Sequence, residues 1–429
     1  MKKNGFTLVE ITVCVVLLVT IFLIVVPKVN TMINNKKKNA YNSLISTVKD
    51  AAQAYVYLNV NIVDDAIESQ GYYEVSIRTL QENELLENKL ENPLTGKNIP
   101  STSIVKIIKN NEEYIYKFSL DYQYLLEHII DLYSSEETRI SNGLKKDNTE
   151  DKNIRYYGSD PNNYVSFNNE LWRIIGVFGN NVKLVRKDSL GSLSWDSSES
   201  SINGGVGINQ WGESKDADGN EYAGADLQVY LNKMYYGGTS VTCYDGTNNQ
   251  ITTCPTNTLD ETSKSLIDNH IWNTGAIEYN TRTDTLAFYS AERGTVNGKI
   301  CTSGDWCNDT VTRTTEWTGY IALPYVTDWA YASSESVCET NMQAQDSNNV
   351  YICKNDNWMF KNTLYWTISP SANAGTSRYV WYVRGDGFVN NRVAASGGAV
   401  FPAIYLKSNI LIESGNGSSS NPYILKLGN

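Results

Sequence analysis

Residues 5–27 of the chain read GFTLVEITVCVVLLVTIFLIVVP, and this stretch decides how the N-terminal part is built. Two lysines precede it, and from Phe6 to Val26 almost every residue is apolar. A helix rises about 1.5 Å per residue, so a helix over this run spans about 30 Å, the thickness of the hydrocarbon core of a bilayer. The stretch therefore predicts one membrane-spanning helix, closed by Pro27.

A single acidic residue, Glu10, interrupts the apolar run near its start. A carboxylate inside a membrane segment is costly unless it has a partner. An ordinary secretory signal has a shorter apolar core followed by a small-residue cleavage site, which the sequence PKVNTM after this core does not provide. A plain membrane anchor needs neither Glu10 nor a glycine–phenylalanine junction.

The same residues resemble the N-terminal signal of type IV pilins and pseudopilins. The matching features are Gly5, Phe6, Glu10 as the fifth residue after the junction, and Pro27 as the twenty-second. The resemblance implies that a prepilin peptidase removes residues 1–5 and methylates the amine of Phe6. It also implies that Glu10 of one subunit neutralises the amine of its neighbour during assembly.

The composition describes a chain that mostly folds. It has 429 residues, enough for two or three domains, with 41% hydrophobic and 19% charged residues. The net charge of −11 argues against nucleic acid as the main partner, because phosphate binding needs a cationic surface. Abundant tyrosine and tryptophan favour a β-rich exported domain.

The N-terminal part is expected to continue as a helix and a small domain. Apolar residues recur at steps of three and four through 28–58, which extends the helix to cover 6–58. Residues 59–135 predict a small α+β domain with a short helix in 75–89, a β-hairpin in 103–120 and a further helix at its end. The resemblance implies that the second half of the long helix packs under this sheet.

Residues 136–162 are polar and charged, and we expect a linker there because little of this segment can be buried. Residues 163–429 predict a larger β-rich α+β domain. Its first three strands lie within 163–190, separated by Asn-Asn and Gly-Asn-Asn turns, and helices are expected at 226–236 and 263–273. This domain resembles an exported domain of Firmicutes surface proteins, and its arrangement is similar to C-type-lectin-like folds. The predicted fold class of the whole chain is α+β.

The chain has seven cysteines, and all but Cys14 lie between positions 243 and 353. Six cysteines in an exported region predict three disulfides, with fifteen pairings to choose from. A zinc site is the alternative, but no CxxC occurs, and the two histidines, His128 and His270, are expected on helices. The simplest pairing joins neighbours: Cys243–Cys254, Cys301–Cys307 and Cys338–Cys353.

Candidate ligand residues are acidic turns and aromatic side chains. No GxSxG, HExxH or phosphate-binding loop occurs, and we expect no enzyme and no cofactor other than calcium. The segment KDADGNE (215–221) offers oxygen ligands beside a glycine, but Leu227 stands where an EF-hand has its glutamate. Acidic turns in water are the alternative interpretation. The candidate calcium or ligand residues are Asp216, Asp218, Asn220, Glu221, Trp306, Asp309, Asp356 and Trp358.

Together these features predict a minor or tip pilin-like subunit, held in the cell membrane by one helix before assembly and then displayed on the cell surface or pilus. Its expected partners are other pilin subunits, the prepilin peptidase, and a host or surface glycan or protein. The aromatic candidates for that recognition are Trp195, Trp211, Trp306, Trp358, Tyr379 and Trp381. One alternative is a pseudopilin of a type II-like secretion machine or of a DNA-uptake machine, where nucleic acid is a partner. Another alternative is a membrane-anchored surface enzyme.

Overall fold

A computed structural model describes residues 36, 39–93, 98–110, 113–118, 123–197, 209–215, 221–246, 250–279, 283–296, 299–300, 314–372 and 378–428. It divides the chain into two compact units, Met1–Gln123 (unit 1) and Tyr124–Asn429 (unit 2). The leader and membrane segment, with Gly5, Phe6, Glu10 and Pro27, lie outside the described residues. Within the described ranges, no helix is both long enough and apolar enough to cross a membrane.

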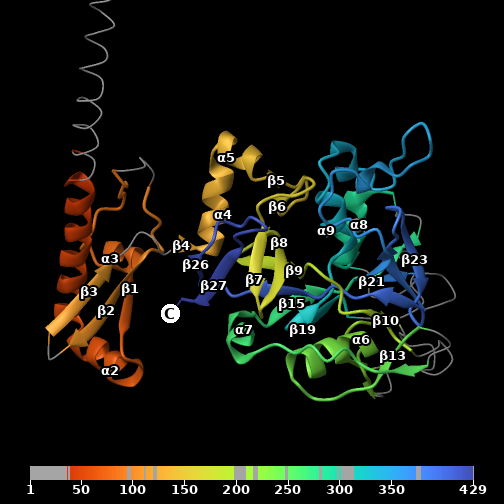
Figure 1. Ribbon diagram of the computed structural model, residues 1–429, viewed down its shortest axis with the longest axis horizontal. Coiled ribbons are helices and arrows are strands. Elements are labelled where there is room, and N and C mark those ends of the chain that lie inside the picture. The colour runs from red at the N-terminus through yellow and green to blue at the C-terminus, as the bar shows by residue number, and fades with distance from the viewer. Residues whose placement is uncertain are drawn as a thin grey trace, which may run out of the picture. The chain divides into compact units, whose positions relative to one another are not determined.

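Unit 1 consists of a helix packed on a three-stranded antiparallel sheet (Figure 1). Residues 39–58 are helical, which agrees with the predicted helix at its described end. The buried residues Val48, Ala52 and Val56 of this helix recur every four positions and pack with Val105 and Ile107 of the sheet. The elements that follow it are α2 (Val60–Gln70), β1 (Tyr73–Ser76), α3 (Ile77–Glu82), β2 (Ile104–Asn110) and β3 (Glu113–Phe118).

The predicted hairpin and short helix of unit 1 are both present. Strands β2 and β3 pair in register from Val105 with Phe118 to Asn110 with Glu113. Helix α3 begins after Ser76, whose side chain accepts a hydrogen bond from the backbone of Thr79. This N-cap satisfies one of the free N–H groups at the start of the helix.

Unit 2 is built on a ten-stranded sheet in the order β20-β25-β9-β8-β7-β27-β26-β4, with β6 pairing β8 beside this path and β5 pairing β6 (Figure 1). The parallel pair of β27 and β7 brings the end of the chain beside the first strand of the β7–β9 segment. The bounds are β4 Gln123–Tyr124, β5 Leu144–Lys146, β6 Ile154–Tyr156, β7 Tyr164–Phe167, β8 Glu170–Phe178, β9 Asn181–Arg186, β20 Ile321–Ala322, β25 Ala403–Leu406, β26 Ile410–Ser414 and β27 Tyr423–Leu427.

Strands β7, β8 and β9 confirm the three strands predicted within 163–190. Asn168 and Asn169, both at φ 56°, make the first turn, and Gly179, also at φ 56°, begins the second. Asparagine and glycine tolerate this left-handed backbone better than other residues do. The Asn-Asn and Gly-Asn-Asn turns were therefore predicted correctly, because the tolerance for this backbone is a property of the turn residues themselves.

A second sheet of unit 2 has the order β10-β24-β21-β22-β23, and β16 pairs with β21 beside this path. Its centre is apolar, because Trp366 on β21 and Trp381 on β22 are fully buried. The bounds are β10 Ser192–Ser194, β16 Ile277–Glu278, β21 Tyr365–Ala372, β22 Tyr379–Val383, β23 Val389–Val393 and β24 Gly397–Ala399.

The helical segments of unit 2 partly match the sequence predictions. The helix predicted at 226–236 is present as α6 (Asp226–Val229), which continues into a π-helix, Tyr230–Tyr236. The one predicted at 263–273 is wrong in its second half, because α7 (Glu261–Leu266) ends early and His270 lies on β15 (His270–Asn273). The other helices are α4 Leu125–Ser134, α5 Glu136–Ser141, α8 Thr285–Glu292, α9 Val326–Tyr331 and the 3₁₀ helices Ser336–Glu339 and Ile352–Lys354.

Short two-stranded ladders complete unit 2, and two of the predicted disulfides are present. Cys243–Cys254 closes the β13–β14 ladder, and Cys338–Cys353 joins the two 3₁₀ helices. The predicted pair Cys301–Cys307 lies outside the described residues. The ladders are β11 Ser214–Lys215 with β12 Glu221–Tyr222, β13 Cys243–Tyr244 with β14 Ile251–Thr252, β15 with β19 Glu316–Gly319, and β17 Thr295–Val296 with β18 Lys299–Ile300.

The linker predicted at 136–162 is wrong. This segment belongs to unit 2 and contains α5, β5 and β6, with Leu144, Asp147 and Tyr156 buried. Its charged residues suggested solvent exposure, but Asp147 and Arg155 pair with each other inside the unit, and Arg155 also pairs with Asp328. Helix α4, expected in the small domain, likewise lies in unit 2. The α+β class itself is confirmed.

Candidate functional site

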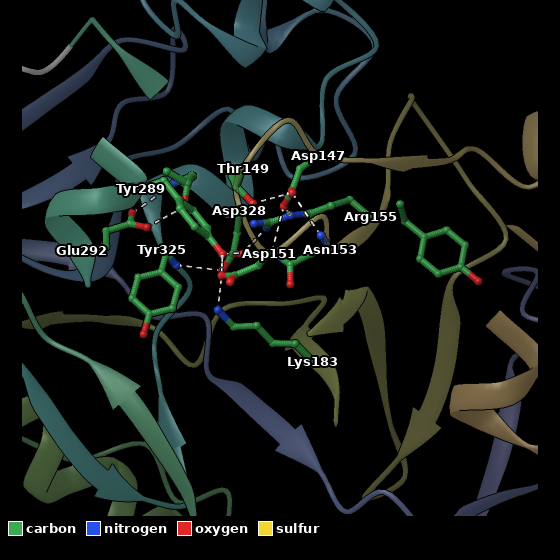
Figure 2. Close-up of polar contacts among 12 residues, drawn as sticks. Asp147, Thr149, Asp151, Asn153, Arg155, Lys183, Tyr289, Glu292, Tyr325 and Asp328 are labelled. Carbon is green, nitrogen blue, oxygen red and sulfur yellow. Dashed lines mark hydrogen bonds and ion pairs between the residues drawn. The ribbon is translucent and has the colours of Figure 1, made fainter. Parts of the chain in front are cut away.

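Five charged side chains meet inside unit 2, where β6, β9, α8 and α9 come together (Figure 2). Their side chains are between 0% and 1% exposed. Charged residues are rarely buried to this degree unless they are paired. We call Asp147, Arg155, Lys183, Glu292 and Asp328 the charge cluster.

The positions of Lys183 and Asp328 follow from their elements. Side chains alternate between the two faces of strand β9, and Asp328 lies where helix α9 begins. On β9, Val182 and Leu184 join the large apolar core, while Lys183 between them points to the other face of the sheet. Asp328 lies in the first turn of α9, and its Oδ2 accepts the backbone N–H of Tyr325, 2.9 Å away, at the N-cap. A carboxylate in the first turn also faces the positive end of the helix dipole.

Asp328 is held by two cations. Its Oδ1 lies 2.7 Å from Nη1 of Arg155 and its Oδ2 lies 2.5 Å from Nζ of Lys183. Burial works to raise the pKa of Asp328, but Lys183 and Arg155 outweigh it and hold that pKa below the usual value. Burial lowers the pKa of Lys183 to about 8, against the attraction of Asp328.

Asp147 binds the other side of Arg155 and organises the loop after β5. Its Oδ2 lies 2.8 Å from Nε of Arg155 and accepts Nδ2 of Asn153 at 3.0 Å. Its Oδ1 accepts the hydroxyl of Thr149 at 2.6 Å and the backbone N–H of Asn153 at 3.1 Å. Burial works against the charge here too, but Arg155 and these donors hold the pKa of Asp147 below its usual value.

Glu292 at the end of α8 is the member without a direct cation at hydrogen-bond distance. Its Oε2 accepts the hydroxyl of Thr327 at 2.6 Å, and the nearest nitrogen of Arg293 lies 3.8 Å away. Burial raises the pKa of Glu292 to about 7, with Arg293 opposing the shift. This carboxyl therefore changes charge near neutral pH while it stays inside the protein.

Aromatic rings enclose the two cations. Nζ of Lys183 lies 4.1 Å from the ring centre of Tyr325 and 5.4 Å from that of Tyr405, and the guanidinium of Arg155 lies 4.6 Å from that of Phe178. Ring faces attract cations and keep water away from them. Asp147 and Asp328 balance the charges of these two buried cations, so removing any one of the four leaves a buried charge without its partner.

The structure describes three of the eight predicted calcium or ligand residues. Asp216, Asp218, Asn220, Trp306 and Asp309 lie outside the described residues. Of the remaining three candidates, Glu221 begins β12, Asp356 is exposed at φ 44°, and Trp358 is buried. In the part of the chain that the structure describes, no group of three His, Cys, Asp or Glu residues is arranged to hold a metal ion.

The aromatic recognition surface is not supported by the described residues. Trp195, Trp211 and Trp381 are fully buried, and Trp358 is 4% exposed with its indole N–H donating to the carbonyl of Tyr156 at 2.9 Å. These rings fill the core of unit 2 instead of facing a ligand. Tyr379 is half-buried at the start of β22.

Unit 1 has an open depression of about 570 Å³ at the loop after α3. Its lining mixes leucines with acidic and amide side chains and holds no arrangement of nucleophile and base. The lining residues are Thr47, Gln81, Glu84, Leu85, Leu86, Glu87, Asn88 and Leu90.

The charge cluster was not among the site residues predicted from the sequence. A signal was present, because Lys183 and Asp328 each stand within runs of apolar residues, VKLV and YVTDWAYA. Charged residues inside buried segments are expected to have partners. The sequence does not show that these two are each other's partner, since they are 145 positions apart.

Comparisons with models of known protein families, with curated proteins and with solved structures found no significant match. The function is therefore argued from the residues and their geometry.

Proposed function

We propose that this chain is a type IV pilin-like subunit, processed between Gly5 and Phe6 and occupying a minor or tip position. Unit 2 is the head that it displays for adhesion or ligand binding. The observation that carries the proposal is the N-terminal stretch itself, in which the junction, Glu10 and Pro27 stand at the spacing of a pilin signal. A membrane-length apolar helix with one carboxylate near its start needs a cationic partner, which the new amine of a neighbouring subunit supplies.

The build of unit 1 supports this proposal. A helix that packs on a small antiparallel sheet through one apolar face is the arrangement expected of a pilin-like head. Residues 39–58 continue in sequence from the apolar stretch, so one chain segment serves both the membrane and the sheet.

Unit 2 supports the role of a displayed head. It has its own sheets and apolar core, and two disulfides fasten its loops, which suits an exported protein. The recognised ligand is a surface glycan or protein, with calcium as a candidate cofactor at 215–221. A chain of subunits that needs only unit 1 to assemble leaves unit 2 free for this contact.

The first experiment tests processing. In the full chain expressed with a prepilin peptidase, Gly5→Val is expected to leave residues 1–5 attached, while Asn4→Ala is expected to be processed normally. The N-terminus of each is read by mass spectrometry. Normal processing of Gly5→Val, or a cut after residue 27 in the unchanged protein, contradicts the assignment of the signal.

The second experiment tests assembly. Glu10→Gln is expected to be processed normally and to be depleted from sheared surface filaments by about tenfold or more, because it removes the charge that pairs with the neighbouring amine. Glu10→Asp keeps the charge and is the matched control. Equal filament content for all three proteins removes the argument from charge pairing.

A further inference from the structure

The closest contact in the charge cluster joins an amine and a carboxyl group. Nζ of Lys183 lies 2.5 Å from Oδ2 of Asp328, and both side chains are at most 1% exposed. Cγ of Asp328 is one covalent bond beyond Oδ2, so the amine lies near the separation of roughly 3–3.5 Å from which attack on a carboxyl carbon begins. Figure 2 shows Lys183 reaching up from β9 toward this carboxyl.

The surroundings of Lys183 favour the uncharged amine that attacks in such a reaction. The rings of Tyr325, Trp272 and Tyr405 lie around Nζ of Lys183, with centres 4.1 Å, 5.3 Å and 5.4 Å away. Burial lowers the pKa of Lys183 to about 8, so its neutral amine is accessible near neutral pH. A desolvated lysine is a nucleophile for this reason.

Arg155 is placed to hold the charge that develops during attack. Its Nη1 lies 2.7 Å from Oδ1 of Asp328, the oxygen that Lys183 does not contact. A fixed cationic donor on the carboxyl oxygen polarises the carbon and stabilises an oxyanion in a dry site. Arg155 is itself kept in place by Asp147 at 2.8 Å.

We propose that Lys183 and Asp328 become joined by an intramolecular amide bond between Nζ and Cγ. A proton passes from the ammonium to the carboxylate, and the amine lone pair attacks Cγ. The oxyanion forms on Oδ1, the oxygen beside Arg155, and the attacking nitrogen passes its second proton to the hydroxyl on Oδ2. The oxyanion then collapses to the amide carbonyl, and the bond from Cγ to Oδ2 breaks to release one water. The step needs no oxidant, reductant or other reactant, because the atoms of an ammonium and a carboxylate equal those of an amide and one water.

The charges that remain support the same assignment. Amide formation removes one cation and one anion together, and leaves Asp147 paired with Arg155 inside the unit. The charges of the ion-pairing groups thus stay balanced after the reaction, and the protein no longer bears the desolvation cost of one ion pair. The new bond ties β9 to α9 across 145 positions of sequence.

Among the residues that the structure describes, the other lysine–carboxylate contacts lack this environment. Nζ of Lys145 lies 2.8 Å from Glu339, but the two side chains are 15% and 24% exposed. Nζ of Lys264 lies 2.7 Å from Glu261, whose side chain is 89% exposed. Water solvates such pairs and keeps both groups ionised. They serve as internal controls within the same protein.

The test is mass spectrometry of the full chain after reduction and denaturation, which removes the contribution of the disulfides. The intact protein is expected to be lighter by the mass of one water than the sequence that begins at its determined N-terminus. Protease digestion is expected to yield a branched peptide that joins the segments carrying Lys183 and Asp328. No such peptide is expected for Lys145 with Glu339.

Variants separate this bond from other losses of water. Lys183→Arg and Asp328→Ala are expected to have the full mass, and Lys145→Arg to keep the loss. The proposal is overturned by full mass in the folded unchanged protein. It is also overturned by a loss that maps to Asp328 alone, as a cyclic imide, without a branched peptide. The unchanged protein decides the question even where a variant fails to fold.

Discussion

Arg155 shows how a single residue holds distant parts of unit 2 together. Its guanidinium bonds to Asp147 in the neighbouring loop and to Asp328, which is 173 positions away. Burial works against the charge of Arg155, but the two carboxylates outweigh it and keep its pKa above the usual value. The residue is therefore a permanent cation in the interior.

Replacing Arg155 with methionine is expected to lower the free energy of unfolding of unit 2 by about 3–5 kcal/mol, because Asp147 stays buried without its cation. All ten tryptophans lie in unit 2, so tryptophan fluorescence during urea unfolding of the full chain reports on this unit alone. Lys264→Met breaks an exposed pair and is expected to change the value by less than about 1 kcal/mol. Similar midpoints for the two variants contradict the role of Arg155.

Glu292 is expected to make the stability of unit 2 depend on pH. Glu292 has a pKa of about 7 in the folded chain, whereas an unperturbed glutamate has a pKa of about 4.5. Between these values the folded state binds more protons, so the free energy of unfolding falls as the pH rises, by roughly 3 kcal/mol in all.

Glu292→Gln removes this titration. The variant is expected to gain stability relative to the unchanged protein as the pH rises from 4.5 to 8, measured by urea unfolding at several pH values. Glu261→Gln, at an exposed position, controls for the change in net charge. A stability difference between Glu292→Gln and the unchanged protein that stays constant with pH shows that Glu292 does not titrate in this window.

At the scale of elements, the sequence best predicted those helices, strands and turns whose conformation depends on neighbouring residues in the sequence. The β2–β3 hairpin and the β7–β9 strands follow from alternating apolar residues and from turn residues that tolerate positive φ. Helix α7 was predicted too long, because the apolar residues of 263–273 fit a helix as well as the strand β15, which forms only by pairing with β19. A local sequence pattern does not reveal a strand partner that lies 40 or more positions away.

The turn between β7 and β8 gives a prediction at this scale. Asn169 is exposed and has φ 56°. Asn169→Ala is expected to lower the free energy of unfolding by about 1 kcal/mol, since a Cβ without a compensating side chain is strained there. Asn169→Gly relieves that strain and is expected to cause no such loss. Equal losses in urea unfolding for both variants contradict the argument.

At the scale of the whole molecule, the largest error in the prediction from sequence is the position at which unit 2 begins. The segment 136–162 looked like a linker because its composition is polar, but composition does not reveal that Asp147 and Arg155 find partners inside the fold. The candidate site was missed for the same reason. Burial of charge depends on contacts between segments far apart in the sequence.

Two fragments test where unit 2 begins. A fragment of residues 124–429 is expected to unfold cooperatively in urea with the same tryptophan-detected midpoint as the full chain. A fragment of residues 163–429, which lacks β5, β6 and Arg155, is expected to lack a cooperative transition. Cooperative unfolding of the shorter fragment at an unchanged midpoint contradicts the boundary at 124.

The parallel pairing of β27 with β7 has a consequence for biogenesis. Strands β26 and β27, within residues 410–427, lie between β7 and β4, which end more than 240 positions earlier in the sequence. The central sheet therefore cannot be completed before residues 410–427 have been translated. Until these residues emerge, unit 2 cannot reach its native state, and an unfolded chain can still pass through a translocation pore. Under the export proposed above, such delayed closure favours translocation before folding.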